Sequence, residues 1–218
     1  MSEKFFQAIK SGDTDSVVAM LGSDSGLLNA RDQNGLDAYT TARYHGKNDI
    51  AKFLLEKGVQ LDVFAASLAG DKERVLTLID QNPELIGAYS QDGWTPLHLA
   101  CFFGQPALTE ALIARGADLT ARSRNPLKNT PLHAAVAGRN VPAVRALIER
   151  GADVNARQEG GWTPMHSAAQ NGDTEMLQLL IAAGANVTVR ADNQQTPLDL
   201  ALGKGHQATV DLLEAYAA

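Results

Sequence analysis

The chain has 218 residues, which is enough for one large domain or two small ones with a well-buried core. Hydrophobic residues make up 44% of it and charged residues 20%, as in globular proteins and unlike disordered ones. The net charge of -6 argues against nucleic acid as a partner, and no segment approaches the roughly 18 apolar residues of a membrane span.

The N-terminal segment has no signal-peptide pattern, so we expect a cytoplasmic protein. The single cysteine, Cys101, cannot form an internal disulfide or a cysteine-rich metal site, in keeping with a reducing compartment. Cys101 follows Ala100 at a position where small apolar residues pack, and we expect its side chain in the core.

The first predicted elements are pairs of short helices joined by a glycine turn. The stretch "EKFFQAIKSGDTDSVVAML" from Glu3 predicts the first pair, around Gly12. The stretch "GLDAYTTARYHG" from Gly35 opens the second pair, and "LDVFAASLAGDKERVLTLID" from Leu61 predicts the third. Apolar residues recur at helical spacing in these stretches.

Four clearer copies follow, and each begins with threonine and proline. The motifs "TPLH", "TPLH", "TPMH" and "TPLD" start at residues 95, 130, 163 and 196, so the successive steps are 35, 33 and 33 residues. Proline in the first turn of a helix loses no useful N–H, and the threonine hydroxyl can cap that turn. A fixed period in this range is typical of stacked repeats.

The period and the T-P-L-H-x-A signature resemble those of the ankyrin repeat family. The resemblance extends over essentially the whole chain and is most specific from Trp94 onward. It implies an all-α fold, an ankyrin-repeat solenoid of stacked helix-turn-helix units with β-hairpin-like fingers, in a single domain over residues 1–218. The predicted repeats are approximately 3–36, 37–60, 61–94, 95–129, 130–162, 163–195 and 196–218.

The chain departs from this pattern in three places. Between Gly58 and Leu61 the usual finger is missing, which predicts a notch between the second and third repeats. The finger before Thr130 has two extra residues. Arg139 stands where most other copies have the turn glycine, so we expect a rearranged turn at that point.

The histidines His98, His133 and His166 recur at one position of the repeat. Consecutive repeats stack about 8 to 10 Å apart, whereas the ligands of one zinc ion lie about 2 Å from it, so the three cannot share a metal. The resemblance implies that each histidine instead hydrogen-bonds backbone groups of adjacent loops. No phosphate-loop, HExxH or GxSxG motif is present, and we expect neither enzyme activity nor a cofactor.

By resemblance, the target-binding surface is concave and comprises the end of each first helix and the finger residues just before each threonine. The candidates at the helix ends are Tyr44, His45, Phe102, Phe103, Gln170 and Asn171, and those before a threonine are Trp94 and Trp162. Aromatic residues are enriched at interfaces. These aromatics either face a partner or fill the gap of the missing finger and pack as core.

Four arginines hold the same finger position and are predicted to form a file along one edge, with Arg124 and Lys128 beside them on the long finger. The four are Arg31, Arg122, Arg157 and Arg190. The file either pairs with carboxylates such as Asp118 and Asp153 or attracts an acidic partner segment. We take Arg122 and Arg124 as candidates for orienting the partner.

The sequence therefore predicts a monomeric, non-enzymatic module for protein–protein interaction that binds a partner protein through its concave face and fingertips. Three alternatives remain open: an inhibitory or scaffolding subunit of one enzyme, a homo-oligomeric structural protein, and an enzyme with a site in the notch. Ankyrin repeats bind chemically unrelated proteins, so this pattern does not identify the partner.

Overall fold

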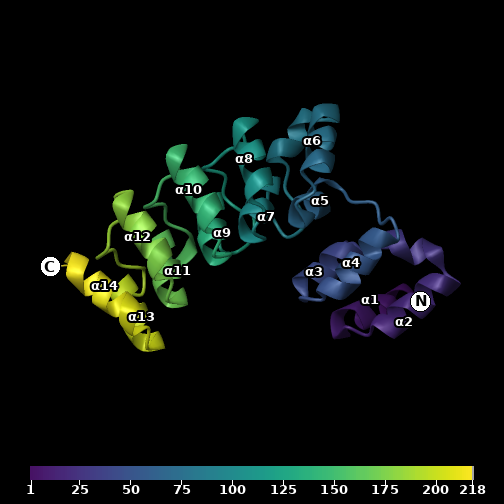
Figure 1. Ribbon diagram of the computed structural model, residues 1–218, viewed down its shortest axis with the longest axis horizontal. Helices are drawn as coiled ribbons and strands as arrows, with labels where there is room; N and C mark the ends of the chain where they lie inside the picture. The colour runs from purple at the N-terminus through teal and green to yellow at the C-terminus, as the bar shows by residue number, and fades with distance from the viewer. Residues whose placement is uncertain (218) are drawn as a thin grey trace. The chain divides into compact units, whose positions relative to one another are not determined.

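The computed structural model describes residues 1–217, which form short helices (Figure 1). Within that range, β structure is limited to one antiparallel bridge between Arg31 and Asp37. The chain is all-α, as predicted. Among the same residues, no helix combines the length and the apolar character that a membrane crossing requires.

Two compact units make up the chain: the N-terminal unit, Met1–Ala66, and the C-terminal unit, from Ser67 onward. The N-terminal unit holds α1 (Ser2–Ser11), α2 (Thr14–Ser23), the 3-10 helix η1 (Ser25–Asn29), α3 (Ala38–Tyr44) and α4 (Asn48–Glu56). Helix α5 (Val63–Ala69) contains the boundary between the units.

The C-terminal unit continues the alternation of short helices. It holds α6 (Lys72–Gln81), η2 (Pro83–Gly87), α7 (Pro96–Phe102), α8 (Pro106–Ala114), α9 (Pro131–Ala137), α10 (Val141–Glu149), η3 (Glu159–Gly161), α11 (Pro164–Asn171), α12 (Thr174–Ala182), α13 (Pro197–Lys204) and α14 (Gln207–Ala217). The grouping of all these helices into seven repeats and one domain, with a notch after the second repeat, stays a prediction.

Helices of the C-terminal unit lie in two rows (Figure 1). The first helices α7, α9, α11 and α13 pack side by side in one row, and α8 packs against α10, and α12 against α14, in the other. Small side chains such as Ala100, Ala135 and Ala169 are fully buried on the first helices. Cys101 is also fully buried, as predicted, and its burial raises the pKa of the thiol to about 12.

Helices α3, α5, α7 and α13 begin with a side-chain cap, whereas α1 follows Met1 without one. The Thr95 hydroxyl accepts a hydrogen bond from the backbone N–H of His98 at 3.4 Å. Asp37 replaces threonine in α3 and accepts from the backbone N–H of Thr40 at 2.7 Å, and Asp62 caps α5 by accepting from the N–H of Ala65 at 2.9 Å. In α3 and α5 a carboxylate thus supplies the cap in place of the threonine.

Arg139 adopts the left-handed backbone conformation itself, with a φ of 53°. Gly172 has a φ of 69° at the corresponding turn, so the expected rearrangement of the turn after α9 is wrong. The Arg139 side chain donates from Nη2 to the carbonyl oxygen of Asn171 at 2.9 Å, which helps to offset the cost of a positive φ for a residue with a Cβ.

The repeated histidines join each first helix to the finger that follows it. Nε2 of His98 lies 3.0 Å from the carbonyl oxygen of Asn129. The two equivalent bonds run from His133 to the Trp162 carbonyl at 3.3 Å and from His166 to the Gln195 carbonyl at 3.2 Å. The structural role that the resemblance implied for these histidines is therefore confirmed.

The hydrogen bonds of His98 require a neutral ring. A carbonyl oxygen can only accept, so Nε2 carries the hydrogen that faces Asn129. Nδ1 accepts from the backbone N–H of Thr95 at 3.4 Å and lies 2.8 Å from the Thr95 hydroxyl, so Nδ1 carries no hydrogen. Burial lowers the pKa of His98 and of His133 from 6.5 to about 4, in agreement with this arrangement.

We expect the protein to lose stability as the pH falls from 7 to 5. The folded-state pKa of about 4 lies below the ordinary value of 6.5, so over this window the unfolded chain takes up protons that the folded chain does not, which lowers the free energy of the unfolded state. His98 and His133 should each account for about 2 kcal/mol of the loss. Urea unfolding at the two pH values measures it.

The His98→Gln variant provides the control for this pH dependence. It should be less stable than the wild type at pH 7, because the bond to Asn129 is weakened, yet it should lose less stability on acidification. A free energy of unfolding that is the same at pH 7 and pH 5 in the wild type would contradict the neutral assignment.

Replacement of Gly138 by alanine should destabilise the protein by about 2 kcal/mol, through overpacking. A Cβ at this position would overlap the carbonyl oxygen of Phe102, although the backbone φ of Gly138 suits any residue. Gly203→Ala is the matched control, because nothing lies within 4 Å of the place that its methyl group would take and α13 should gain up to about 1 kcal/mol. Thermal unfolding of both variants measures the difference, and equal stabilities would refute the close approach of α9 to α7.

Candidate partner-binding site

Three of the predicted site residues form one cluster at the start and end of α7. The Trp94 ring meets the Phe102 ring edge to face, with centroids 5.2 Å apart, and Phe102 meets Phe103 in the same way at 5.1 Å. We call Trp94, Phe102 and Phe103 the aromatic ridge. Phe102 is 37% exposed, and the other two side chains are half-buried.

The buried histidine holds the ridge in place from below. Trp94 precedes the capping residue Thr95, and its ring packs against the ring of His98 at a centroid distance of 5.9 Å. Since His98 is fixed by Thr95 on one side and by the Asn129 carbonyl on the other, the tryptophan rests on a rigid support. The ridge therefore presents exposed aromatic surface above a histidine that is hydrogen-bonded through both ring nitrogens.

Trp162 repeats this arrangement two repeats further along. It is half-buried and stacks on His166 with a centroid distance of 5.7 Å and an interplanar angle of 30°. Asn129 takes the equivalent position in the repeat between them. Asn129 is 4% exposed, and its Oδ1 is buried with no hydrogen-bond partner among the residues that the structure describes.

Gln170 and Asn171 lie at the end of α11, where their carbonyl groups join neighbouring repeats. The Gln170 carbonyl is 3.1 Å from Nε2 of His206, and the Asn171 carbonyl accepts from Arg139. Gln170 is exposed and Asn171 is half-buried. The bonds to these two carbonyl groups were not predicted, because they depend on how the side chains of His206 and Arg139 are oriented in the folded protein.

Tyr44 and His45 belong to the N-terminal unit, at the end of α3. Both residues are exposed, and His45 is the C-terminal cap of the helix. They occupy the same position in their repeat as Phe102 and Phe103 do in theirs. Their predicted part in partner binding stays a prediction.

Each of the four arginines in the file donates a hydrogen bond to a backbone carbonyl group. Arg122 donates to the Arg157 carbonyl at 2.6 Å, and Arg157 donates to the Arg190 carbonyl at 3.1 Å. The carboxylates of Asp118 and Asp153 accept instead from nearby backbone N–H groups in their own turns, both at 2.8 Å. The pairing with these two aspartates is therefore wrong, because local turn geometry already uses them.

Two arginines of the file do have carboxylate partners, which differ from those expected. Arg31 bonds Asp62 at 3.1 Å within the N-terminal unit, and Arg157 bonds Asp192 at 3.1 Å. On the long finger, Lys128 bonds Glu159 at 2.8 Å. These pairs are exposed on both sides, so each contributes little stability.

Arg124 lies beside the ridge on the long finger. Its backbone N–H donates to the carbonyl of Gly93 at 2.8 Å, and its guanidinium carbon lies 4.0 Å from the centre of the Tyr89 ring. A side chain on Gly93 would overlap the backbone of Arg124, so glycine permits this approach. The contact of Arg124 with Tyr89 was not predicted, since nothing in the sequence of either finger indicated which side chain Arg124 covers.

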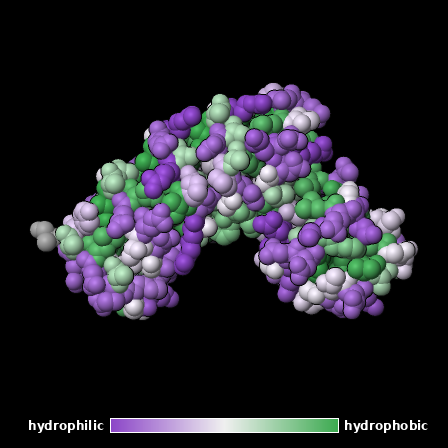
Figure 2. Space-filling view, in the orientation of Figure 1, coloured by the Kyte–Doolittle hydropathy of each residue, from purple (hydrophilic) through white to green (hydrophobic). Residues whose placement is uncertain are grey.

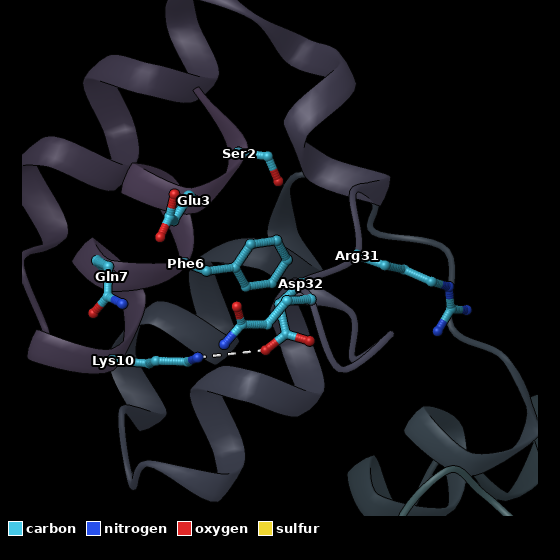
Figure 3. A pocket seen from close by; sticks show the side chains of 8 residues that line it. Ser2, Glu3, Phe6, Gln7, Lys10, Arg31 and Asp32 are labelled. Carbon is cyan, nitrogen blue, oxygen red and sulfur yellow. Dashed lines mark hydrogen bonds and ion pairs between the residues drawn. The ribbon is translucent and has the colours of Figure 1, made fainter.

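The N-terminal unit contains two hollows away from these candidates. A cavity of about 260 Å³ is lined by Ser2, Glu3, Phe6, Gln7, Lys10, Arg31, Asp32 and Gln33, and the ion pair of Lys10 with Asp32 crosses it at 3.4 Å (Figure 3). Asp32 also accepts two backbone N–H bonds within its finger, so it is fully engaged there.

The second hollow is an apolar groove of about 260 Å³ over α2 and α4. It is lined by Val18, Leu21, Gly22, Ser25, Leu28, Phe53 and Lys57. Val18, on α2, is 44% exposed. Hydrophobic side chains gather on this face of the N-terminal unit in Figure 2. This groove was not predicted from the sequence. The resemblance placed the target-binding surface at the ends of the first helices and in the fingers, and not on second helices such as α2 and α4.

The described residues, 1–217, contain no cluster suited to a metal ion. Within them, no three histidine, cysteine or carboxylate side chains lie close enough together to hold one. The three buried histidines are each used to join repeats, as described above.

Comparisons with known proteins agree with the repeat pattern. A family model described as "Ankyrin repeat" matches residues 92–124, and one described as "Ankyrin repeats (many copies)" matches residues 132–181. The chain is 30% identical over 136 residues to "Target of rapamycin complex 2 subunit AVO2" of Saccharomyces cerevisiae, a match that covers 57% of this chain and 32% of that protein.

A second relative is "Protein phosphatase 1 regulatory subunit 27" of Mus musculus. It is 39% identical over 80 residues, which is 33% of this chain and 52% of the mouse protein. The chain thus spans about a third of one relative and about half of the other. Together with the Thr-Pro caps, the histidine bonds and the two rows of helices, these matches show that the chain contains ankyrin repeats, over residues 92–124 and 132–181.

Proposed function

We propose that the protein is a non-enzymatic interaction module that binds a partner protein through the aromatic ridge and the fingers of the C-terminal unit. The observation that carries the proposal is the exposed Phe102 ring, held by Trp94 above a buried and fully bonded histidine. A rigid aromatic cluster loses little conformational entropy on binding and can be desolvated efficiently by a partner.

The candidate residues for this surface are the sequence-predicted ones that lie in the C-terminal unit. They are Trp94, Phe102, Phe103, Arg122, Arg124, Trp162, Gln170 and Asn171. Tyr44 and His45 are further candidates for partner binding, in the N-terminal unit. A monomeric state and a cytoplasmic location remain part of the proposal.

A more specific candidate is a regulatory or scaffolding subunit that acts on one enzyme. The names of the two relatives, a subunit of a target of rapamycin complex and a regulatory subunit of a protein phosphatase, support this candidate. A stable one-to-one complex with an enzyme would distinguish it from a general binding module, and self-association measured by light scattering would favour the homo-oligomeric alternative.

The triple variant Trp94→Ala, Phe102→Ser, Phe103→Ser should lose at least about tenfold in affinity for the partner, because aromatic anchors dominate binding energy. Affinity capture from a lysate of the encoding organism, quantified by mass spectrometry against the wild type, identifies the proteins that depend on the ridge. Circular dichroism must show equal helix content for both proteins.

The matched control removes exposed apolar side chains from the second helices of the N-terminal unit. Val18→Ser on α2 with Leu55→Ser on α4 should leave capture unchanged, since both residues are exposed and lie outside the C-terminal unit. If this control loses the partner while the triple variant retains it, the binding site lies on the second helices and the ridge is structural.

A further inference from the structure

We propose that the partner segment bound by the C-terminal unit is extended and acidic, with one large apolar side chain placed on the aromatic ridge. This inference rests on the proposed function and names the chemistry of its partner. It follows from the charges around the ridge and from the way in which the arginines are held.

Arginines stand on both sides of the ridge. On the finger side, the backbone of Arg124 is bonded to Gly93, the residue before Trp94. On the helix side, Gly138 approaches the carbonyl of Phe102 so closely that it leaves no room for a side chain, and Arg139 follows it. The backbone next to each arginine thus touches the ridge, at its finger end and at its helix end, and the two guanidinium groups lie at the Tyr89 ring and at the Asn171 carbonyl.

Neither guanidinium group is neutralised. Arg139 bonds the Asn171 carbonyl, and Arg124 covers the Tyr89 ring. Among residues 1–217, the ion pairs involve neither of these arginines, nor Arg122 or Arg190. A carbonyl or a ring fixes the orientation of a guanidinium but leaves its full charge and most of its five N–H donors for a carboxylate.

The fingers of the C-terminal unit reverse the charge of the chain as a whole. The chain has 19 basic and 25 acidic residues. The finger segments 89–94, 122–129, 156–162 and 189–195 instead contain five basic residues (Arg122, Arg124, Lys128, Arg157, Arg190) and three acidic ones (Asp92, Glu159, Asp192). Glu159 and Asp192 are already paired with Lys128 and Arg157. The charge of these finger segments is therefore complementary to that of a short acidic segment.

The spacing of the repeats indicates an extended partner. Neighbouring repeats stack about 8 to 10 Å apart, and an extended chain advances about 3.3 Å per residue. Carboxylates three residues apart in such a chain would meet arginines in successive repeats. Because the whole protein carries a net charge of -6, a long polyanion would be repelled at a distance, which favours a few carboxylates over a nucleic acid.

Selection from a random library of 12-residue peptides displayed on phage, with the full chain as bait, tests the proposal. Enriched peptides should contain several Asp or Glu residues and one aromatic or large aliphatic residue. Neutral or basic enriched peptides would overturn the proposal while leaving the binding function in place, and the absence of any enriched peptide would also overturn it, because it requires a linear segment.

The most enriched peptide, labelled with fluorescein, then allows affinities to be compared by anisotropy. Exchange of its Asp and Glu residues for Asn and Gln should weaken binding at least about tenfold, as should Arg124→Gln combined with Arg139→Gln in the protein. The matched control is Arg145→Gln with Arg150→Gln, which removes two exposed arginines at and just after α10 and should change affinity less than about twofold.

Two further results separate this inference from its alternatives. An equal loss of affinity in the α10 control would show that net charge alone acts, and would overturn the assignment to Arg124 and Arg139. A labelled oligouridylate of about 20 nucleotides that binds as tightly as the peptide would also overturn it, in favour of a nucleic acid. An acidic peptide that binds the ridge variant as tightly as the wild type would instead refute the proposed function.

Discussion

The buried, neutral histidine is the constraint on which the C-terminal unit depends. One ring nitrogen accepts from the threonine that caps its own helix, and the other donates to the carbonyl group that precedes the next threonine. Because both nitrogens are used, a single side chain fixes the start of one helix and its distance from the next finger. The same ring supports Trp94 or Trp162 from below, so the bond that stacks the repeats also positions the candidate site.

Backbone bonds between fingers complete this frame. The carbonyls of Gly93, Leu127 and Gly160 accept from the N–H groups of Arg124, Glu159 and Asp192, one finger to the next. Arginine side chains run alongside from Arg122 to the Arg157 carbonyl and from Arg157 to the Arg190 carbonyl. The fingers are therefore joined by backbone hydrogen bonds, and backbone carbonyl groups fix the arginine side chains beside them. Because a carbonyl group is uncharged, these arginines keep their positive charge at fixed positions.

Much of this could be predicted because it is local. The Thr-Pro motif specifies its helix start by chemistry within four residues, and the repeat period places His98, Trp94 and Phe102 at matching positions. The arginine contacts could not be predicted, since a carbonyl in the next finger becomes an acceptor only once the finger has its final shape. Arg139 was misjudged for a related reason: its unfavourable φ is tolerated through a bond to Asn171, 32 residues away in the chain.

The position of the two tryptophans has a practical consequence. Trp94 and Trp162 are the only tryptophans of the chain, and each is half-buried on a histidine at the base of a finger in the C-terminal unit. The emission of an indole ring depends on its contact with water and on the groups that touch it. A ligand that covers this surface should therefore change the intrinsic tryptophan fluorescence of the protein. Binding at the candidate site can be followed in this way without an added label.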